Sequence, residues 1–237
     1  MLERPFTLII ISTISFLCSC NKADPNAYLS KIKSICFCGD SYTAGLFYDK
    51  ENNKLGEIPS KGYAKLIADK YRLTLENHSI SNAATGDYIA LSNGLDATLN
   101  GPISDLYVIV LGINDYWKSL DLGSLDDLSS DDKKDNFYVN MYTIVNSIKN
   151  KSANSDIIIM KCIRPFDKEM YNFYSTAVED IANYCGVLFG ETINDQYLNS
   201  SSFEQGMNKD HPSIEQQGKL SQSIENIINS SFETREK

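Results

Sequence analysis

One stretch constrains the fold of this chain most strongly, the continuous apolar run of residues 106–111. A strand that is apolar at every position is expected where helices cover both faces of a parallel sheet. Four more short apolar runs occur, at residues 33–38, 73–77, 156–163 and 187–189. Segments with helical spacing lie between and after the runs, at residues 61–71, 87–99, 136–150, 169–185 and 213–229. This alternation predicts an α/β fold with a parallel sheet of about five strands.

Two polar segments interrupt the alternation. Residues 48–59 are rich in Asn and Lys and are interpreted as a surface loop, after which Ser60 caps the first long helix. Residues 118–135 hold six aspartates without an apolar period. Their spacing does not follow the alternating ligand pattern of an EF-hand, so this segment is interpreted as a second solvated loop.

The composition fits one folded domain. The chain has 237 residues, of which 42% are hydrophobic, enough for a single sizeable core. The net charge is -9, and the sequence has no basic patch. This balance argues against nucleic acid as a partner and against electrostatic attachment to anionic lipid.

The N-terminus has the pattern of a signal peptide. Arg4 precedes the apolar run of residues 6–17, which is too short to span a bilayer comfortably. The sequence Leu17-Cys18-Ser19-Cys20 then resembles a bacterial lipobox, in which the last cysteine becomes lipidated and N-terminal. A plain secretory signal cut nearby is the alternative.

The lipobox divides the chain into three parts. Residues 1–19 are expected to be the lipoprotein signal peptide, residues 20–30 the lipidated N-terminus and tether, and residues 31–237 the folded domain. A lipid on Cys20 would anchor the protein in the bacterial cell envelope while its domain stays in water.

Four cysteines fall within the expected domain: Cys36, Cys38, Cys162 and Cys185. Their spacing matches no common metal site, which favours buried free thiols. A disulfide between Cys162 and Cys185 stays open as an alternative in an oxidising compartment.

Polar motifs follow several of the predicted strands. Gly39-Asp40-Ser41 follows the first strand, and the small-residue segment 79–86 follows the second. Gly112-Ile113-Asn114-Asp115 follows the third, and Asp210-His211-Pro212 precedes the last helix. Open α/β sheets bind ligands at the carboxyl ends of their strands, so Ser41 is interpreted as a catalytic nucleophile.

Together and in this order, the four motifs resemble those of the SGNH (GDSL-type) hydrolases, over residues 34–223. The resemblance implies a flavodoxin-like three-layer α/β/α sandwich and a serine esterase that needs no metal or cofactor. It implies that Ser41 attacks the ester carbonyl and that His211 is the general base. The oxyanion hole would combine the Ser41 N–H, a backbone N–H of the second motif and the Asn114 side chain.

Two departures from the family pattern affect these assignments. The second motif usually offers a glycine, whereas Asn82 stands in its place, and asparagine tolerates a positive φ better than most residues. A shifted alignment would make Gly86 the donor instead. The family's acid, three residues before the histidine, is replaced by Asn208, which leaves a Ser–His dyad, a triad with Asp210 as a displaced acid, or an inactive relative. The second histidine, His78, is expected to be structural or part of the cleft wall.

The resemblance and the expected anchor together imply deacylation of an extracellular ester, most simply an O-acetyl group of a carbohydrate or another short-acyl ester. The aromatic side chains near the motifs could stack on sugars or belong to core and rim: Tyr42, Tyr48, Tyr88, Tyr116 and Trp117. A lysophospholipase or thioesterase, and a non-catalytic glycan-binding lipoprotein, are the alternatives. The expected partners are therefore a small-molecule or glycan ester and, through the lipid anchor alone, a membrane.

Overall fold

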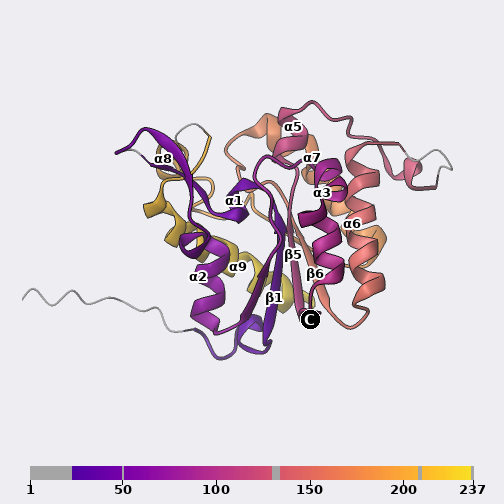
Figure 1. Cartoon of the computed structure of the whole chain (residues 1–237), viewed down its shortest axis with the longest axis horizontal. Coiled ribbons are helices and arrows are strands. Elements are labelled where there is room, and N and C mark those ends of the chain that lie inside the picture. Colours follow the sequence, from indigo (N-terminus) through magenta and orange to yellow (C-terminus); the bar gives the residue numbers. More distant parts are fainter. Residues whose placement is uncertain (1–22, 50, 130–133, 208–209, 236–237) are drawn as a thin grey trace, which may run out of the picture.

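Five parallel strands form the central sheet in the computed structural model, which describes residues 23–49, 51–129, 134–207 and 210–235 (Figure 1). In sheet order the strands are β4 (Thr74–Asn77), β1 (Ser34–Gly39), β5 (Leu106–Val110), β6 (Asp156–Met160) and β7 (Leu188–Gly190). This order is that of flavodoxin-like folds, in which ligands bind where the sheet order reverses, between the first and third strands. The predicted fold class is confirmed.

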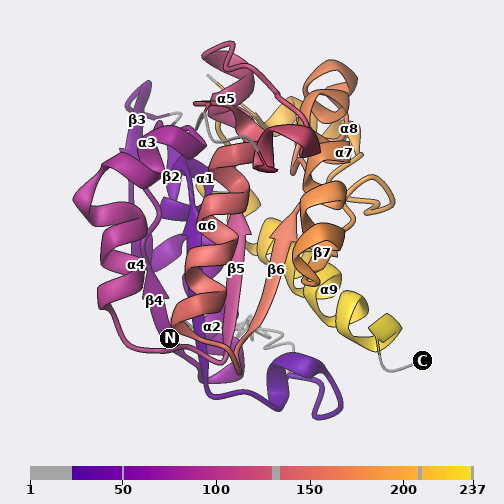
Figure 2. The same cartoon turned by 90° about the vertical axis from the view of Figure 1, so that its right-hand side faces the viewer.

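Helices cover both faces of the sheet. On one face α2 (Tyr63–Tyr71) packs against α9 (Gln217–Arg235), as Figure 1 shows. On the other, α3 (Thr85–Ala90) packs against α6 (Phe137–Lys151), which packs against α7 (Lys168–Cys185) (Figure 2). Between these layers every residue of β5 is buried, as its apolar run predicts.

The remaining elements are short. The helices and turns among them are η1 (Tyr28–Ser30), α1 (Ser41–Ala44), η2 (Pro59–Lys61), a π-helical turn η3 (Ser92–Asp96), α4 (Ala97–Asn100), α5 (Ile113–Trp117), η4 (Leu125–Ser129), α8 (Ser201–Gly206) and η5 (Ile214–Gln216). In Figure 2, α1 and α5 lie toward the carboxyl ends of the strands. The motifs found in the sequence therefore gather at one edge of the sheet.

The expected surface loop at residues 48–59 is a β-hairpin instead. Strands β2 (Leu46–Asp49) and β3 (Lys54–Glu57) pair antiparallel. The prediction fails because the hairpin is held by few apolar residues: Phe47 is buried and lies against Gly56, where a Cβ would approach the ring to 3.2 Å. The residues around Phe47 are mostly polar, so the sequence does not predict this contact.

Two predicted helices differ from the structure. The helix expected at residues 87–99 is interrupted, because Gly94 has non-helical torsion angles and its backbone approaches the carbonyl of Tyr88. The helix expected from residue 61 begins at Tyr63, with Gly62 rather than Ser60 at its N-cap. Pro59 starts a separate 3₁₀ turn, η2, and Ser60 is its second residue.

The folded domain begins inside the segment expected to be a tether. Leu29 is fully buried, and its N–H donates to Asn229 Oδ1 on α9 at 3.1 Å. The ring of Tyr28 stacks on Phe232 with centroids 3.5 Å apart. The expected signal peptide and Cys20 lie outside the described residues. Among the helices that the structure describes, none combines the length and apolarity needed to span a membrane.

Cys36, Cys38, Cys162 and Cys185 are all buried, free thiols, so the alternative of a Cys162–Cys185 disulfide is wrong. Cys162 follows β6, and its backbone N–H donates to Ser175 Oγ, in the middle of α7, at 3.4 Å. Cys185 ends α7, ten residues after Ser175, which corresponds to about 15 Å along a helix. Within the described residues, no group of three His, Cys, Asp or Glu side chains is placed to hold a metal ion.

Candidate active site

The turn from β1 into α1 places Ser41. Asp40 is the N-cap of α1, and its Oδ1 accepts a hydrogen bond from the Tyr42 N–H at 3.0 Å. Gly39 allows the turn to be tight, because a Cβ there would overlap the side chain of Thr43. Ser41 is thus the first helical residue, whose N–H has no acceptor within its own helix.

His211 approaches Ser41 from the other end of the chain. Its Nε2 lies 3.0 Å from Ser41 Oγ, within hydrogen-bond distance. The backbone is held on both sides of the histidine: the Tyr42 hydroxyl donates to the Asp210 carbonyl at 2.5 Å, and the Tyr48 N–H donates to the Pro212 carbonyl at 3.1 Å. We call these two bonds the histidine clamp. They join α1 and the β2–β3 hairpin to the loop that carries His211, which we call the histidine loop.

Of the two candidates for the acid partner of His211, the structure describes Asp210. Asn208 lies outside the described residues. Asp210 has a φ of 62°, and its Oδ1 accepts a hydrogen bond from Arg164 Nη1 at 3.3 Å. To act as the displaced acid, the Asp210 carboxylate would therefore have to interact with His211 while it is paired with Arg164.

The second and third motifs are tied to each other. Asn82 has a φ of 68°, the conformation that its residue type tolerates. The Asn114 side chain donates from Nδ2 to the Ala83 carbonyl at 3.0 Å. Gly112, with a φ of 132°, turns the chain from β5 into α5 and lies where a Cβ would collide with the Tyr174 ring. These contacts fix Asn114 beside the Asn82 turn.

Gly86, the alternative to Asn82, lies elsewhere. It is part of α3, and its Cα faces Asp135 and Asn140, so that a Cβ would come to 3.0 Å from the Asp135 carboxylate. It lines a different hollow from Ser41. The geometry favours Asn82 over Gly86 as the residue beside Ser41.

A cavity of about 340 Å³ joins these residues. Ser41, Asn82, Asn114 and His211 all line it. Leu46, Leu55, Trp117 and Arg164 are also part of its wall. Larger surface hollows exist, including one of about 780 Å³ beside α2 and α9, but none of the motif residues lines that one. The smaller cavity is therefore the candidate active site.

The sequence model of the GDSL-like lipase/acylhydrolase family matches residues 37–215. The chain belongs to this family. It is accordingly an ester hydrolase of the GDSL type, and the matched span contains Ser41, Asn82, Asn114 and His211. None of the curated proteins matches the sequence.

Solved structures share the fold of this GDSL-like hydrolase at low sequence identity. The psychrotrophic esterase EstA from Pseudoalteromonas sp. is 19% identical, with a TM-score of 0.59 and coverage of 84% of this chain and 97% of that chain. The lipase/acylhydrolase from Enterococcus faecalis is 17% identical, with a TM-score of 0.56 and coverage of 84% and 96%. A family two carbohydrate esterase from Clostridium thermocellum, in complex with cellohexaose, is 17% identical, with a TM-score of 0.61 and coverage of 84% and 64%.

A buried carboxylate lies next to Asn114 at the GDSL-like site. Asp115, next to Asn114, accepts hydrogen bonds from the Thr85 N–H at 3.1 Å and from Thr85 Oγ1 at 2.5 Å. Burial raises the pKa of Asp115 to about 6, against the effect of these hydrogen bonds. The contact joins α5 to α3. The sequence offered Asp115 only as part of a motif and gave no sign of its partner, Thr85.

Of the aromatic residues near the motifs, Trp117 alone combines a place in the cavity wall with high exposure, 53%. Tyr42 also lines the cavity but is buried, as are Tyr48 and Tyr88. Tyr116 packs edge-on against Trp117 and Phe173. Within this set, Trp117 is therefore the ring whose face is open to a ligand of this GDSL-like site.

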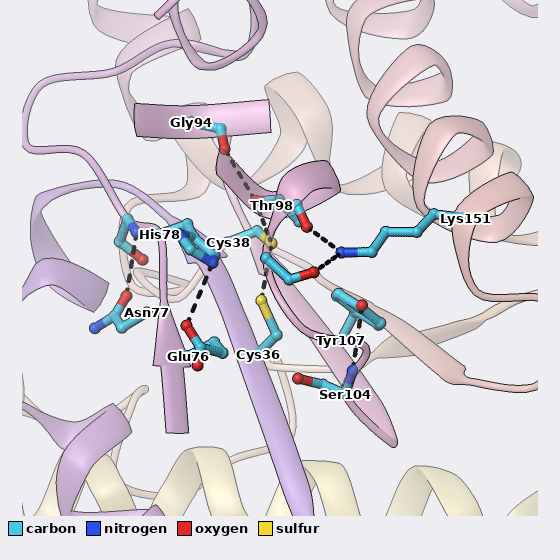
Figure 3. Close-up of polar contacts among 12 residues, drawn as sticks. Cys36, Cys38, Glu76, Asn77, His78, Gly94, Thr98, Ser104, Tyr107 and Lys151 are labelled. Atoms are coloured by element: carbon cyan, nitrogen blue, oxygen red, sulfur yellow. Dashed lines mark hydrogen bonds and ion pairs between the residues drawn. The ribbon is translucent and has the colours of Figure 1, made fainter. Parts of the chain in front are cut away.

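His78 lies outside the cavity wall. Figure 3 shows its ring directed toward Glu76, with Nε2 3.7 Å from Oε2 of that residue, in the region of the Cys36 and Cys38 thiols. Burial lowers the pKa of His78, although Glu76 opposes the effect. Its surroundings fit the structural role expected from the sequence and leave His211 as the histidine of the GDSL-like site.

Proposed function

We propose that this hydrolase cleaves carboxylic esters through an acyl-enzyme formed on Ser41. The observation that carries the proposal is the distance of 3.0 Å between Ser41 Oγ and His211 Nε2 in the wall of a cavity. At this distance the imidazole can take the hydroxyl proton while Oγ attacks the carbonyl carbon.

In the proposed reaction, a bond forms between Ser41 Oγ and the acyl carbon as the serine proton moves to His211. The tetrahedral intermediate then collapses, its bond to the alcohol oxygen breaks, and the imidazolium gives its proton to the leaving alcohol. Water attacks the acyl group in the same way, with His211 again as base. This step releases the carboxylic acid and restores the Ser41 hydroxyl.

Three N–H groups are proposed to stabilise the oxyanion: the backbone N–H of Ser41, the backbone N–H of Asn82 and the side-chain amide of Asn114. The position of Ser41 at the start of α1 supports the first assignment, because that N–H has no acceptor within the helix. The second Nδ2 proton of Asn114 is available beside the one donated to Ala83.

We propose that the pair works as a dyad oriented by the histidine clamp. An imidazolium needs a fixed ring orientation to return its proton, and the two backbone bonds of Asp210 and Pro212 limit the movement of His211. Asn208, in the usual position of the acid, supplies no negative charge.

The substrate is proposed to be a short-acyl ester of an extracellular carbohydrate. The volume of about 340 Å³ is near the lower end of ligand pockets, which suits an acetyl group better than a long chain. The exposed Trp117 ring at the wall offers an apolar face to a sugar. The fold shared with a carbohydrate esterase is further support.

Purified full-length protein in neutral detergent tests the proposal with p-nitrophenyl acetate, butyrate and octanoate and with O-acetylated xylan. We expect turnover that falls with acyl length, and none by Ser41→Ala. A fluorophosphonate should label the wild type but not this variant. Glycan binding without turnover or labelling would instead favour a non-catalytic lipoprotein, and a preference for octanoate would favour a lysophospholipase or thioesterase.

We also propose that the protein is anchored in the cell envelope by a lipid on Cys20. The support is the lipobox-like sequence Leu17-Cys18-Ser19-Cys20 after a short apolar run. Growth of an expressing bacterium with labelled palmitate should label the wild type in the membrane fraction. The Cys20→Ala variant should lose the label, and equal labelling of both proteins would contradict the proposal.

A further inference from the structure

Arg164 is a buried charge in the wall of the active-site cavity. It follows β6 at the carboxyl edge of the sheet and lines the same cavity as Ser41 and His211. Its side chain is only 8% exposed. A cation so far from water is costly unless its charge and its N–H groups are matched by partners.

The partners of Arg164 are incomplete. A guanidinium carries five N–H donors. Among the described residues, the guanidinium of Arg164 donates one hydrogen bond, from Nη1 to Asp210 Oδ1 at 3.3 Å. This distance is longer than that of most charge-assisted hydrogen bonds. The Asp210 side chain is 61% exposed, so water weakens its attraction. Nε is buried without an acceptor among the described residues.

A second buried cation on the same segment, Lys161, is fully paired and provides a comparison for Arg164. Lys161, three residues earlier, is also 8% exposed, and its Nζ contacts carboxylates of Glu179 at 2.6 Å and Glu191 at 2.8 Å. Lys161 does not line the cavity. Among the described residues, the buried cation outside the site therefore contacts two carboxylates, while the one inside the site contacts one carboxylate and the face of the Phe166 ring.

The surroundings keep Arg164 charged. Burial disfavours the charged form, but the carboxylates of Asp210 and Asp167 favour it, and the pKa of Arg164 lies above its usual value. A charged guanidinium with spare donors, held beside a nucleophilic serine, is suited to a planar oxyanion, which it can bind through two parallel hydrogen bonds.

We propose that Arg164 binds a carboxylate of the substrate close to the scissile ester, so that the site selects esters of acidic compounds, such as acylated acidic sugars. This inference rests on the proposed esterase function and names its substrate class. In the protein without substrate, Arg164 is paired with Asp210. The substrate carboxylate binds to Arg164 beside Asp210 or displaces the Asp210 carboxylate from it.

Two acetyl esters that differ in one charge test the inference, 4-acetoxybenzoate and 4-acetoxybenzamide, with full-length protein in neutral detergent. We expect kcat/KM to be at least about tenfold higher for the carboxylate, mainly through KM. Arg164→Gln should abolish the preference, and Arg164→Lys should keep part of it, because lysine retains the charge but not the fork. Lys161→Gln, which removes the paired cation outside the cavity, should leave the ratio unchanged.

A second pair of esters places the charge on the acyl side: the mono-4-nitrophenyl ester of succinic acid and that of succinamic acid. A preference of wild type for the charged member of either pair, lost in Arg164→Gln, supports the inference. Absence of preference in both pairs overturns it. An equal loss on charged and neutral esters in Arg164→Gln also overturns it, because Arg164 would then only position the histidine loop.

Binding to the Ser41→Ala variant separates this inference from the proposed function. If wild type hydrolyses none of the esters, the esterase proposal fails, and calorimetry decides the anion site. Binding of 4-acetoxybenzoate but not of the benzamide, abolished by adding Arg164→Gln, would uphold the anion site. Equal binding of the two compounds, or no binding of either, would overturn it.

Discussion

The Tyr42 hydroxyl donates a hydrogen bond of 2.5 Å to the main-chain carbonyl of Asp210, the residue before the proposed general base. Tyr42 directly follows the proposed nucleophile, so one side chain of α1 fixes the distance between the two reacting groups. The ring of Tyr42 also lies 5.5 Å from that of His211. The proposed nucleophile and the proposed base are thus positioned by a contact between their immediate neighbours.

Tyr42→Phe should lower kcat by about tenfold, with little change in KM, since a loss of about 1.4 kcal/mol in transition-state stabilisation has this effect. The variant keeps the ring but leaves the Asp210 carbonyl without its donor. Tyr63→Phe is the matched control, because the Tyr63 hydroxyl bonds to Thr43 Oγ1 at 2.6 Å, outside the cavity wall. Equal losses in the two variants would mean that the clamp has no special role.

Asn114→Ala should lower kcat by about 10²–10³, the usual effect of removing one oxyanion donor. KM should change less, because the oxyanion exists only in the transition state. Steady-state kinetics with p-nitrophenyl acetate provide the measurement, and circular dichroism controls for folding because Asn114 also donates to Ala83. An unchanged kcat would exclude Asn114 from the oxyanion hole.

Asn208→Asp should raise kcat, because a carboxylate three residues before the histidine restores the family's acid and stabilises the imidazolium. The gain should be largest near neutral pH, where the new aspartate is ionised. Asn208→Ala serves as the control and should not raise the rate. A rate for Asn208→Asp at or below wild type would show that this chain orients His211 without an acid at that position.

The stability of the fold should fall as the pH rises through neutrality. Burial raises the pKa of Asp40 to about 7, above its usual value near 4. Folding therefore favours the protonated carboxyl, a contribution fully present below about pH 4 and lost as the pH passes about 7. Asp115, with a pKa of about 6, acts in the same direction. Asp40→Asn keeps a capping oxygen, so its Tm should fall less than that of wild type between pH 5 and pH 8, whereas parallel Tm curves would contradict the assignment.

Gly39→Ala should destabilise the fold by about 1–3 kcal/mol or more, because the new methyl group overlaps the Thr43 side chain in a packed turn. Gly218→Ala is the opposite control. A Cβ at Gly218 meets nothing within 4 Å, and alanine in a helix is favoured over glycine by about 0.5–1 kcal/mol. Urea unfolding of both variants measures the effects, and destabilisation by both would contradict this view of the β1–α1 turn.

The central strands could be predicted from the sequence because each carries its signal locally. Residues 106–111 are apolar throughout, and burial on both faces requires that pattern. The positive φ of Asn82 was also foreseeable, since few residue types accept it. The β2–β3 hairpin was missed because its stability depends on Phe47 and on ties to distant parts of the chain, such as the bond from Ser81 Oγ to Glu57 Oε2 at 2.6 Å.

The contacts around Ser41 and His211 that distinguish this site cannot be predicted from the neighbouring sequence. The bond between Tyr42 and Asp210 spans 168 positions, and that between Arg164 and Asp210 spans 46. A tyrosine within a helix and an arginine after a strand have many ordinary roles. Motif order could locate Ser41 and His211, but the contacts around them emerge only when the topology brings the strand ends together.

The β2–β3 hairpin has a consequence for how this protein can acquire new substrates. Leu55, 41% exposed, belongs to the cavity wall, while Tyr48 on the paired strand holds the carbonyl of Pro212. The same β-hairpin therefore contributes Leu55 to the cavity wall and Tyr48 to the positioning of the proposed base. Mutations that reshape this rim are therefore expected to move the proposed base as well, which couples substrate range to turnover in this hairpin.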